Sequence, residues 1–222
     1  MIRSEQFSPP PFDRGEIRRY AACGTENDAV TALCEECICE AEPLLDYRVC
    51  SLILPIERQS ESLRFGSITT SSTTLRKALT DCEEVVLFAA TVGVGIDRLI
   101  ARYGQISPSR ALWFQAIGAE RIESLCNAFV ARREGELCRN GMCLKTRVSP
   151  GYGDIPLALQ RDIFALLDCP RKIGLTLSES LLMSPTKSVT AFAGITPGTK
   201  KANKTTCEQC QKADCLYRKG TQ

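Results

Sequence analysis

The feature that most constrains the fold is a long amphipathic pattern between Ser107 and about Asn140. Within it, apolar, small and amide side chains recur at steps of three and four residues, which places them on one face of an α-helix. They are Leu112, Gln115, Gly118, Ala119, Ile122, Leu125, Cys126 and Phe129. We therefore expect one long central helix, and the glycine in its apolar face predicts a point of close packing.

Shorter helices and strands surround this helix without a regular alternation of strand and helix. Asp13 and Asn27 are expected to cap two helices, one ending near Tyr20 and one near Leu45. Further helices are expected at 72–79, 95–104 and up to 167, and strands at 47–57, 63–72, 83–93, 144–147, 175–183 and 188–195. The predicted class is α+β, with a mixed or antiparallel sheet, the long central helix and flanking helices.

The composition changes near the C-terminus of the 222-residue chain. Residues 1–196 are expected to form one domain, because they carry the periodic apolar patterns and contain no internal repeat. Residues 197–222 are polar, rich in lysine and contain cysteines. This second segment is predicted to be a short, flexible tail.

Thirteen cysteines and no histidine set limits on the chemistry. The odd number of cysteines, many of them in apolar patterns, favours reduced thiols in a cytoplasmic protein. The lack of histidine excludes Ser-His and Cys-His nucleophilic pairs, and it excludes a histidine ligand to a corrinoid or haem from this chain. The net charge of +2 without a basic stripe argues against nucleic acid, and no apolar run is long enough to cross a membrane or to act as a signal peptide.

The stretch RVSPGYGDIPLALQRDIFALLD, residues 147–168, carries the most specific functional signal. Pro150 and the two glycines that follow it define a shaped turn, from which Tyr152 is expected to be presented to solvent. Arg147 is a cation that can pair with a carboxylate through two hydrogen bonds.

The acidic residue after this turn is expected to begin a helix. Asp154 is expected to be the N-cap of a helix that runs through Leu167, with Pro156 in its first turn. Its free N–H groups would then point toward Arg147 and complete an anion pocket beside an aromatic face. A purely structural turn with a surface arginine explains the same residues.

Together with the later stretch IGLTLSESLLMSPTKSVTAFAGI, this segment resembles the activation (reactivation) domain of cobalamin-dependent methionine synthase. The family pattern reads approximately R-P-A-P-G-Y-P, then a helix, then L-T-E-S-x-x-M-x-P-x-x-S-V. The order and spacing agree from Arg147 to Val189, and the likeness extends from about Asp13 to Ile195. The chain is most similar to short, free-standing members that lack the catalytic modules. It departs from the pattern at Val148-Ser149 and at Gly153.

The resemblance implies that the chain binds S-adenosylmethionine and supports the remethylation of inactive cob(II)alamin. The positions it implicates in binding are Arg147, Ser149, Gly151, Tyr152, Glu123 and Asp13. Arg147 would pair with the carboxylate of the donor, Ser149 and Gly151 would offer backbone contacts, and Tyr152 would line the ligand. Glu123 matches a ligand-binding glutamate of the long helix, and Asp13 matches an aspartate near the N-terminus.

The same resemblance implies partners. The cobalamin would be held by a corrinoid-carrying methionine synthase chain, and a flavodoxin-like protein would supply the electron. The polypeptide would thus be a component of a methyltransferase of methionine biosynthesis, and not a complete enzyme.

Cysteines in the tail suggest a second kind of site. Cys207, Cys210 and Cys215 form a C-x2-C-x4-C run in a polar segment where burial does not explain thiols. They could hold zinc or an iron–sulfur cluster, and they could equally be redox-active or unligated. By contrast, the cysteines at 34, 37 and 39 and the glycine-rich TVGVG turn are interpreted as structural.

Three functional hypotheses follow. The first is a donor-binding reactivation subunit that acts on a corrinoid methionine synthase. The second is a metal or electron-transfer accessory protein of a corrinoid methyltransferase, which would work through the cysteine tail. The third is a docking partner that no longer binds the donor.

Overall fold

A computed structural model describes residues 1–23 and 27–198 of the chain. A five-stranded sheet organises it, with the strand order β1-β2-β6-β10-β7 and antiparallel pairing throughout. These strands are β1 (Arg3–Gln6), β2 (Arg48–Pro55), β6 (Glu84–Thr91), β7 (Met142–Leu144) and β10 (Ser188–Pro197). A small three-stranded sheet and a two-strand ribbon comprise β3 (Glu57–Arg58), β4 (Leu63–Phe65), β5 (Ile68–Thr70), β8 (Thr176–Leu177) and β9 (Met183–Ser184).

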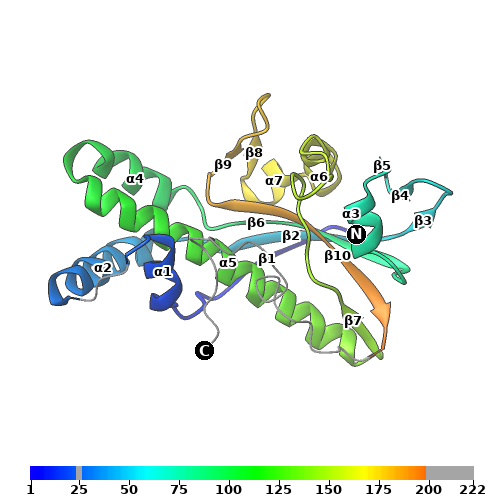
Figure 1. Cartoon of the computed structure of the whole chain (residues 1–222), viewed down its shortest axis with the longest axis horizontal. Helices are drawn as coiled ribbons and strands as arrows, with labels where there is room; N and C mark the ends of the chain where they lie inside the picture. The colour runs from blue at the N-terminus through cyan, green and yellow to red at the C-terminus, as the bar shows by residue number, and fades with distance from the viewer. Residues whose placement is uncertain (24–26, 199–222) are drawn as a thin grey trace.

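Helices cover both faces of the main sheet (Figure 1). On one face lie α1 (Arg14–Tyr20), α2 (Asp28–Ala41), α4 (Gly95–Ile106) and α5 (Pro108–Cys138). The other face carries α3 (Thr73–Ala78), α6 (Leu159–Leu167) and α7 (Cys169–Ile173). A 3-10 turn, η1 (Glu42–Leu44), follows α2. The α+β class predicted from the sequence is confirmed.

Strand β6 joins the two hydrophobic cores. It is the middle strand of the sheet, and its side chains alternate between the faces. Val86, Phe88 and Ala90 pack into the core beneath α5, and Val85, Leu87 and Ala89 pack into the core beneath α6. Burial on both faces explains why this segment reads as a continuous apolar run in the sequence.

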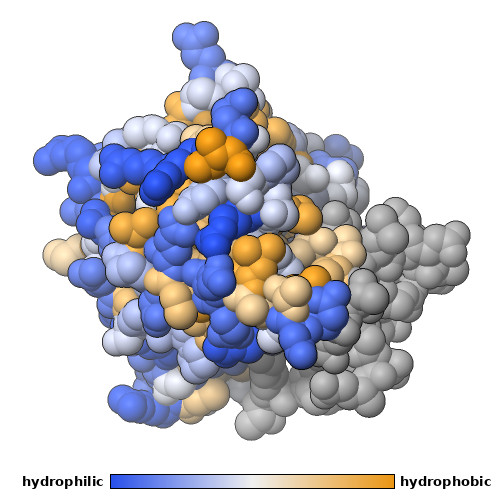
Figure 2. Space-filling view, turned by 90° about the vertical axis from the view of Figure 1, so that its left-hand side faces the viewer, coloured by the Kyte–Doolittle hydropathy of each residue, from blue (hydrophilic) through white to orange (hydrophobic). Residues whose placement is uncertain are grey.

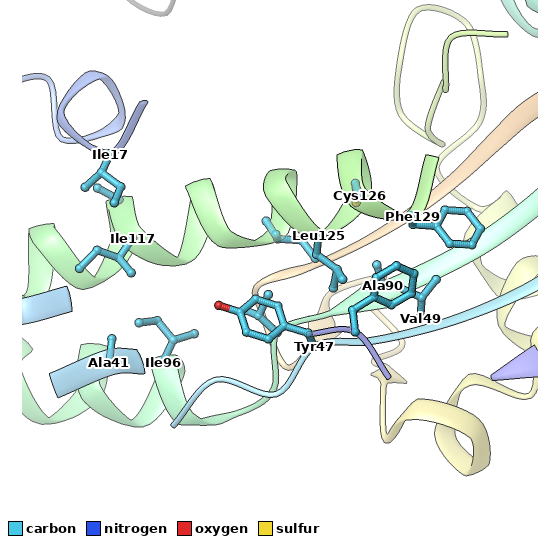
Figure 3. Packing of buried hydrophobic residues seen from close by; sticks show 14 of the residues in the cluster. Ile17, Ala41, Tyr47, Val49, Ala90, Ile96, Ile117, Leu125, Cys126 and Phe129 are labelled. Atoms are coloured by element: carbon cyan, nitrogen blue, oxygen red, sulfur yellow. The ribbon is translucent and has the colours of Figure 1, made fainter. Parts of the chain in front are cut away.

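The long helix is present as predicted. Leu125 and Phe129 of α5 lie on the side of Val49 and Ala90 in Figure 3, and these residues belong with Cys126 to one buried core. The Phe129 and Phe88 rings lie 4.6 Å apart between centroids. The predicted close approach also occurs, because a Cβ at Gly118 would lie only 2.8 Å from the Lys187 side chain.

Several elements differ from the sequence prediction. Helix α7 was not predicted, and the segment 175–183, expected as a strand, forms part of the ribbon β8–β9. The segment 63–72, expected as one strand, is the hairpin β4–β5, in which Gly66 adopts a φ of +60°. Strand β1 was not predicted, because its residues are polar and mostly exposed. It is an edge strand of the main sheet and pairs with β2, and its Glu5 forms ion pairs with Arg132 and Arg133 of α5.

Most cysteines in the described residues are interior side chains. Cys34 and Cys37 are buried on α2, whereas Cys39 is exposed, as the helical spacing predicts. Burial raises the pKa of the Cys37 thiol to about 11. The TVGVG turn is also tightly packed, since a Cβ at Gly95 would meet the carbonyl oxygen of Leu44 at 2.1 Å.

The end of the molecule formed by α2 and α4 is shown in Figure 2. Hydrophilic side chains dominate this face, with apolar ones scattered among them. None of the helices in residues 1–23 and 27–198 combines the length and the apolar character that a membrane span requires.

The N-terminal proline-rich segment is fastened to α5 by a buried arginine. The Arg121 side chain is 0% exposed and donates to the carbonyl oxygens of Pro10 and Pro11, at 2.6 and 2.7 Å. It also pairs with the buried carboxylate of Glu120, and its guanidinium lies 3.8 Å from the Phe12 ring centroid. These contacts use the charge of Arg121 to hold a backbone segment that has no secondary structure of its own.

Replacing Arg121 is expected to destabilise the protein strongly. Arg121→Ala would leave a buried carboxylate without its cation and two backbone carbonyls without their Arg121 donors, and breaking a buried pair costs about 3–5 kcal/mol. Urea-induced unfolding measures the loss. The control is Arg171→Ala, whose side chain is 86% exposed and whose ion pair with Asp168 should contribute less than about 1 kcal/mol. Equal stability losses in the two variants would contradict the role of Arg121.

Candidate functional site

Arg147 lies at the edge of the main sheet, where the chain leaving β7 continues beside β10. The backbone N–H of Lys145 donates to Gly194 at 2.8 Å, and that of Val148 donates to Phe192 at 2.9 Å. The latter bond requires an N–H that the proline of the family pattern lacks. Because Val148 packs into the core beneath α6, the alternation of side chains directs Arg147 to the opposite face, toward α5.

The Arg147 guanidinium contacts two residues of α5. Its Nη2 lies 2.6 Å from Glu123 Oε2, and its Nη1 donates to Asn127 Oδ1 at 2.8 Å. Glu123 and Asn127 are four residues apart, so they occupy neighbouring positions on one face of the helix. The side chain of Arg147 is 23% exposed and that of Glu123 is 45% exposed. Two of the predicted binding residues are therefore in direct contact, at a position open to solvent.

Asp13 is located near the same face of α5. It caps α1 as predicted, with its side chain accepting from the backbone N–H of Glu16 at 3.0 Å. Its own backbone N–H donates to Glu120 Oε1 at 3.4 Å, one helical turn before Glu123. Asp13 is thus hydrogen-bonded to α5, the helix that carries Glu123 and Asn127.

The turn after Arg147 presents Tyr152, as expected. Pro150 is buried and Tyr152 is 55% exposed. Within the turn, the Tyr152 N–H donates to the Ser149 carbonyl at 3.1 Å, and the Gly151 N–H donates to the Ile155 carbonyl at 2.9 Å. The Gly151 N–H is therefore engaged inside the turn, which leaves its carbonyl as the polar backbone group that could face a ligand.

Asp154 does not cap the following helix, which corrects the sequence prediction. Helix α6 begins at Leu159 with Ala158 as its N-cap. The Asp154 carboxylate instead accepts four hydrogen bonds at the start of α3, from Ser72 Oγ, from the backbone and hydroxyl of Thr73, and from the backbone of Thr74. The physical reason is that the first N–H groups of α3 lack helical partners, and the turn brings the carboxylate to them.

The N-terminus of α6 also differs from the expected anion site. The N–H groups of Leu159, Gln160 and Arg161 donate to carbonyl oxygens three residues earlier, at 3.0–3.2 Å. These donors are consequently unavailable to a ligand. In the structure, the positive charge of the site comes from Arg147 and not from this helix.

Gly153, a departure from the family pattern, is required by this arrangement. Its φ is +58°, which proline cannot adopt, and a Cβ there would lie 2.5 Å from Thr74 Oγ1. The turn therefore packs directly on α3.

Sequence reasoning missed Asn127. An amide four residues after a candidate acid on a predicted helix is the signal that could have identified it. The described residues contain no group of three or more possible metal-ligating side chains. The predicted metal ligands Cys207, Cys210 and Cys215 lie outside the described residues.

The two largest of the surface hollows described in residues 1–23 and 27–198 lie elsewhere. One of about 540 Å³ is lined by Arg58, Thr73, Arg76, Lys77, Thr80 and Asp81, beside α3. Another of about 650 Å³ lies between the α6–α7 region and the segment around β8. Neither is lined by Arg147 or Glu123, so hollow size alone does not single out the candidate site.

The fold is that of a methionine synthase reactivation domain. A crystal structure of the MetH reactivation domain bound to AdoHcy superposes with a TM-score of 0.62 and 17% sequence identity, covering 90% of this chain and 80% of that one. Residues 140–220 match the model of the family described as vitamin B12 dependent methionine synthase, activation domain. The resemblance found in the sequence is thereby confirmed. No curated protein sequence matches the chain.

The contacts of Asp154 predict a pH-dependent stability. Hydrogen bonds from Ser72, Thr73 and Thr74 hold the pKa of this carboxyl far below its usual value. A lowered folded-state pKa stabilises the protein above the unfolded value of about 4, and this contribution is lost as the pH falls below it. We expect Asp154→Asn to be less stable than the wild type at neutral pH, with a smaller difference at about pH 3.

Urea unfolding at both pH values tests this expectation. Glu179→Gln is the matched control, because it removes an exposed carboxylate from another turn. A stability difference for Asp154→Asn that does not change with pH would show that the carboxylate charge is not involved.

Proposed function

We propose that this chain binds S-adenosylmethionine and acts as the reactivation domain for a cobalamin-dependent methionine synthase carried on a partner chain. The observation that carries the proposal is the solvent-accessible pair of Arg147 and Glu123. The match of residues 140–220 to the activation-domain family supports it, as does the fold shared with a reactivation domain that binds AdoHcy.

The Arg147–Glu123 pair suits the amino-acid end of the donor. This part of S-adenosylmethionine carries one carboxylate and one ammonium group, and so has no net charge. Inserted between Arg147 and Glu123, it would give each charged group a partner of opposite sign. The site would remain neutral overall, whereas a ligand with only one of the two groups would leave a charge unpaired.

The exposed ring of Tyr152 is proposed to cover the rest of the ligand. A sulfonium is a cation with little hydration, and the face of an aromatic ring attracts such groups. The carbonyls of Ser149 and Gly151 would contribute hydrogen-bond acceptors from the same turn. Asp13, whose backbone N–H donates to Glu120 on the same helix, is proposed to border the same ligand.

The protein's part in the reaction is positioning. The bound donor supplies a methyl group that is already activated by its attachment to sulfur, for transfer to a reduced corrinoid on the partner chain. A flavodoxin-like protein is proposed to provide the electron. The chain contains no histidine and so offers no imidazole ligand for the corrinoid itself.

Binding of S-adenosylmethionine tests the proposal directly. Calorimetric titration should show binding by the wild type and affinity reduced at least tenfold in Arg147→Ala, roughly 1.4 kcal/mol. The exposed Arg171→Ala variant should bind like the wild type. Circular dichroism establishes that each variant is folded.

Two results would count against the proposal, one against donor binding and one against the site. A folded wild type that does not bind S-adenosylmethionine would favour a docking role on a corrinoid protein. Equal affinities of the wild type and Arg147→Ala would place the ligand away from this pair.

A further inference from the structure

Asn127 is the second partner of Arg147, and neither the family resemblance nor the fold comparison assigns it a role. We propose that Asn127 is a positioning residue, which holds the Arg147 guanidinium in place when the carboxylate of the ligand replaces Glu123 as its ionic partner. This inference rests on the proposed function. It adds a determinant of specificity for ligands with an amino-acid end.

The geometry separates the two contacts of Arg147. Glu123 contacts Nη2 and Asn127 accepts from Nη1, so one contact can be exchanged while the other persists. Glu123 is nearly half exposed, which leaves its side chain free to rotate toward an incoming ammonium group. Without Asn127, Arg147 would lose its contact with Glu123 when the ligand binds and would have no other side-chain partner among the described residues to hold it. The entropy lost in fixing the arginine side chain on the ligand would then weaken binding.

The chemistry of the amide suits this role. Asn127 is a neutral acceptor, and thus it orients Arg147 without neutralising its charge. A carboxylate at this position would attract the guanidinium as well, but it would compete with the ligand for Arg147 and would repel the ligand carboxylate. The residue type therefore matches a site that must keep its cation available.

The backbone that carries Asn127 is well anchored. The preceding residues, Leu125 and Cys126, are completely buried between α5 and the sheet (Figure 3). Burial raises the pKa of the Cys126 thiol to about 12, so this neighbour stays uncharged and does not compete for Arg147. On the other side, the two backbone hydrogen bonds of Lys145 and Val148 fix the strand that carries Arg147.

The test compares Asn127→Ala and Asn127→Asp with the wild type, using two probes. One probe is S-adenosylmethionine, and the other is 5′-methylthioadenosine, which keeps the adenosine and sulfur but lacks the amino-acid end. Asn127→Ala should weaken binding of S-adenosylmethionine about three- to tenfold, as expected for losing one hydrogen bond to a charged group near the surface. Its affinity for methylthioadenosine should stay within about twofold of the wild type.

The aspartate variant distinguishes positioning from a purely structural role. Asp at 127 keeps the acceptor for Arg147 and has almost the same shape as Asn. If the residue were only structural, Asn127→Asp would be milder than Asn127→Ala. The proposal requires the opposite order for S-adenosylmethionine, because the added charge competes with the ligand carboxylate. This order decides the question even if methylthioadenosine binds too weakly to measure.

Ser109→Ala, near the start of the same helix, is the matched control and should bind both probes normally. If Arg147→Ala loses affinity but Asn127→Ala does not, this inference is wrong and the proposed function stands. Equal weakening of both probes in Asn127→Ala would also overturn it, since Asn127 would then support the whole pocket. A wild type that binds neither probe would overturn both proposals.

Discussion

The packing of α5 against the antiparallel sheet is the interaction on which the rest of the structure depends. Its apolar face meets β6, the middle strand of the sheet, whose side chains enter both cores and thereby link the helical layer to the opposite face. The close approach at Gly118 brings α5 next to the segment that enters β10. Burial of apolar surface along this helix supplies the main stabilisation, because it removes large side chains such as Phe129 from water.

The same helix carries charged groups in two very different environments. Glu120 and Arg121 are buried and pair with each other, and Arg121 also donates to the N-terminal segment. Further along the helix, Glu123 and Asn127 reach Arg147 at the surface. This spacing along one rigid helix keeps the exposed pair in a fixed position relative to the sheet edge. A site of this kind is preorganised by its scaffold, which lowers the entropy lost on binding.

The turn that follows Arg147 connects this surface with the other core. Asp154 caps α3 from across the fold, and Gly153 permits the close contact with Thr74. Gly153 stands where the family pattern has a proline, and its φ of +58° belongs to a turn that proline could not form. The position of Tyr152 is consequently set by α3 as well as by the strand that carries Arg147.

The sequence by itself determined the long helix, the capping of α1 and α2, the buried strand β6 and the shaped turn at Tyr152, because each depends on residues close together in the chain. It also identified Arg147 and Glu123 as candidates, through a family resemblance. Only the tertiary structure decided that these two side chains touch, that Asn127 joins them, and that Asp154 caps α3 and not α6. The same holds for strand β1, whose polar residues are ordered by pairing with β2. These features depend on contacts between distant segments, which local patterns do not encode.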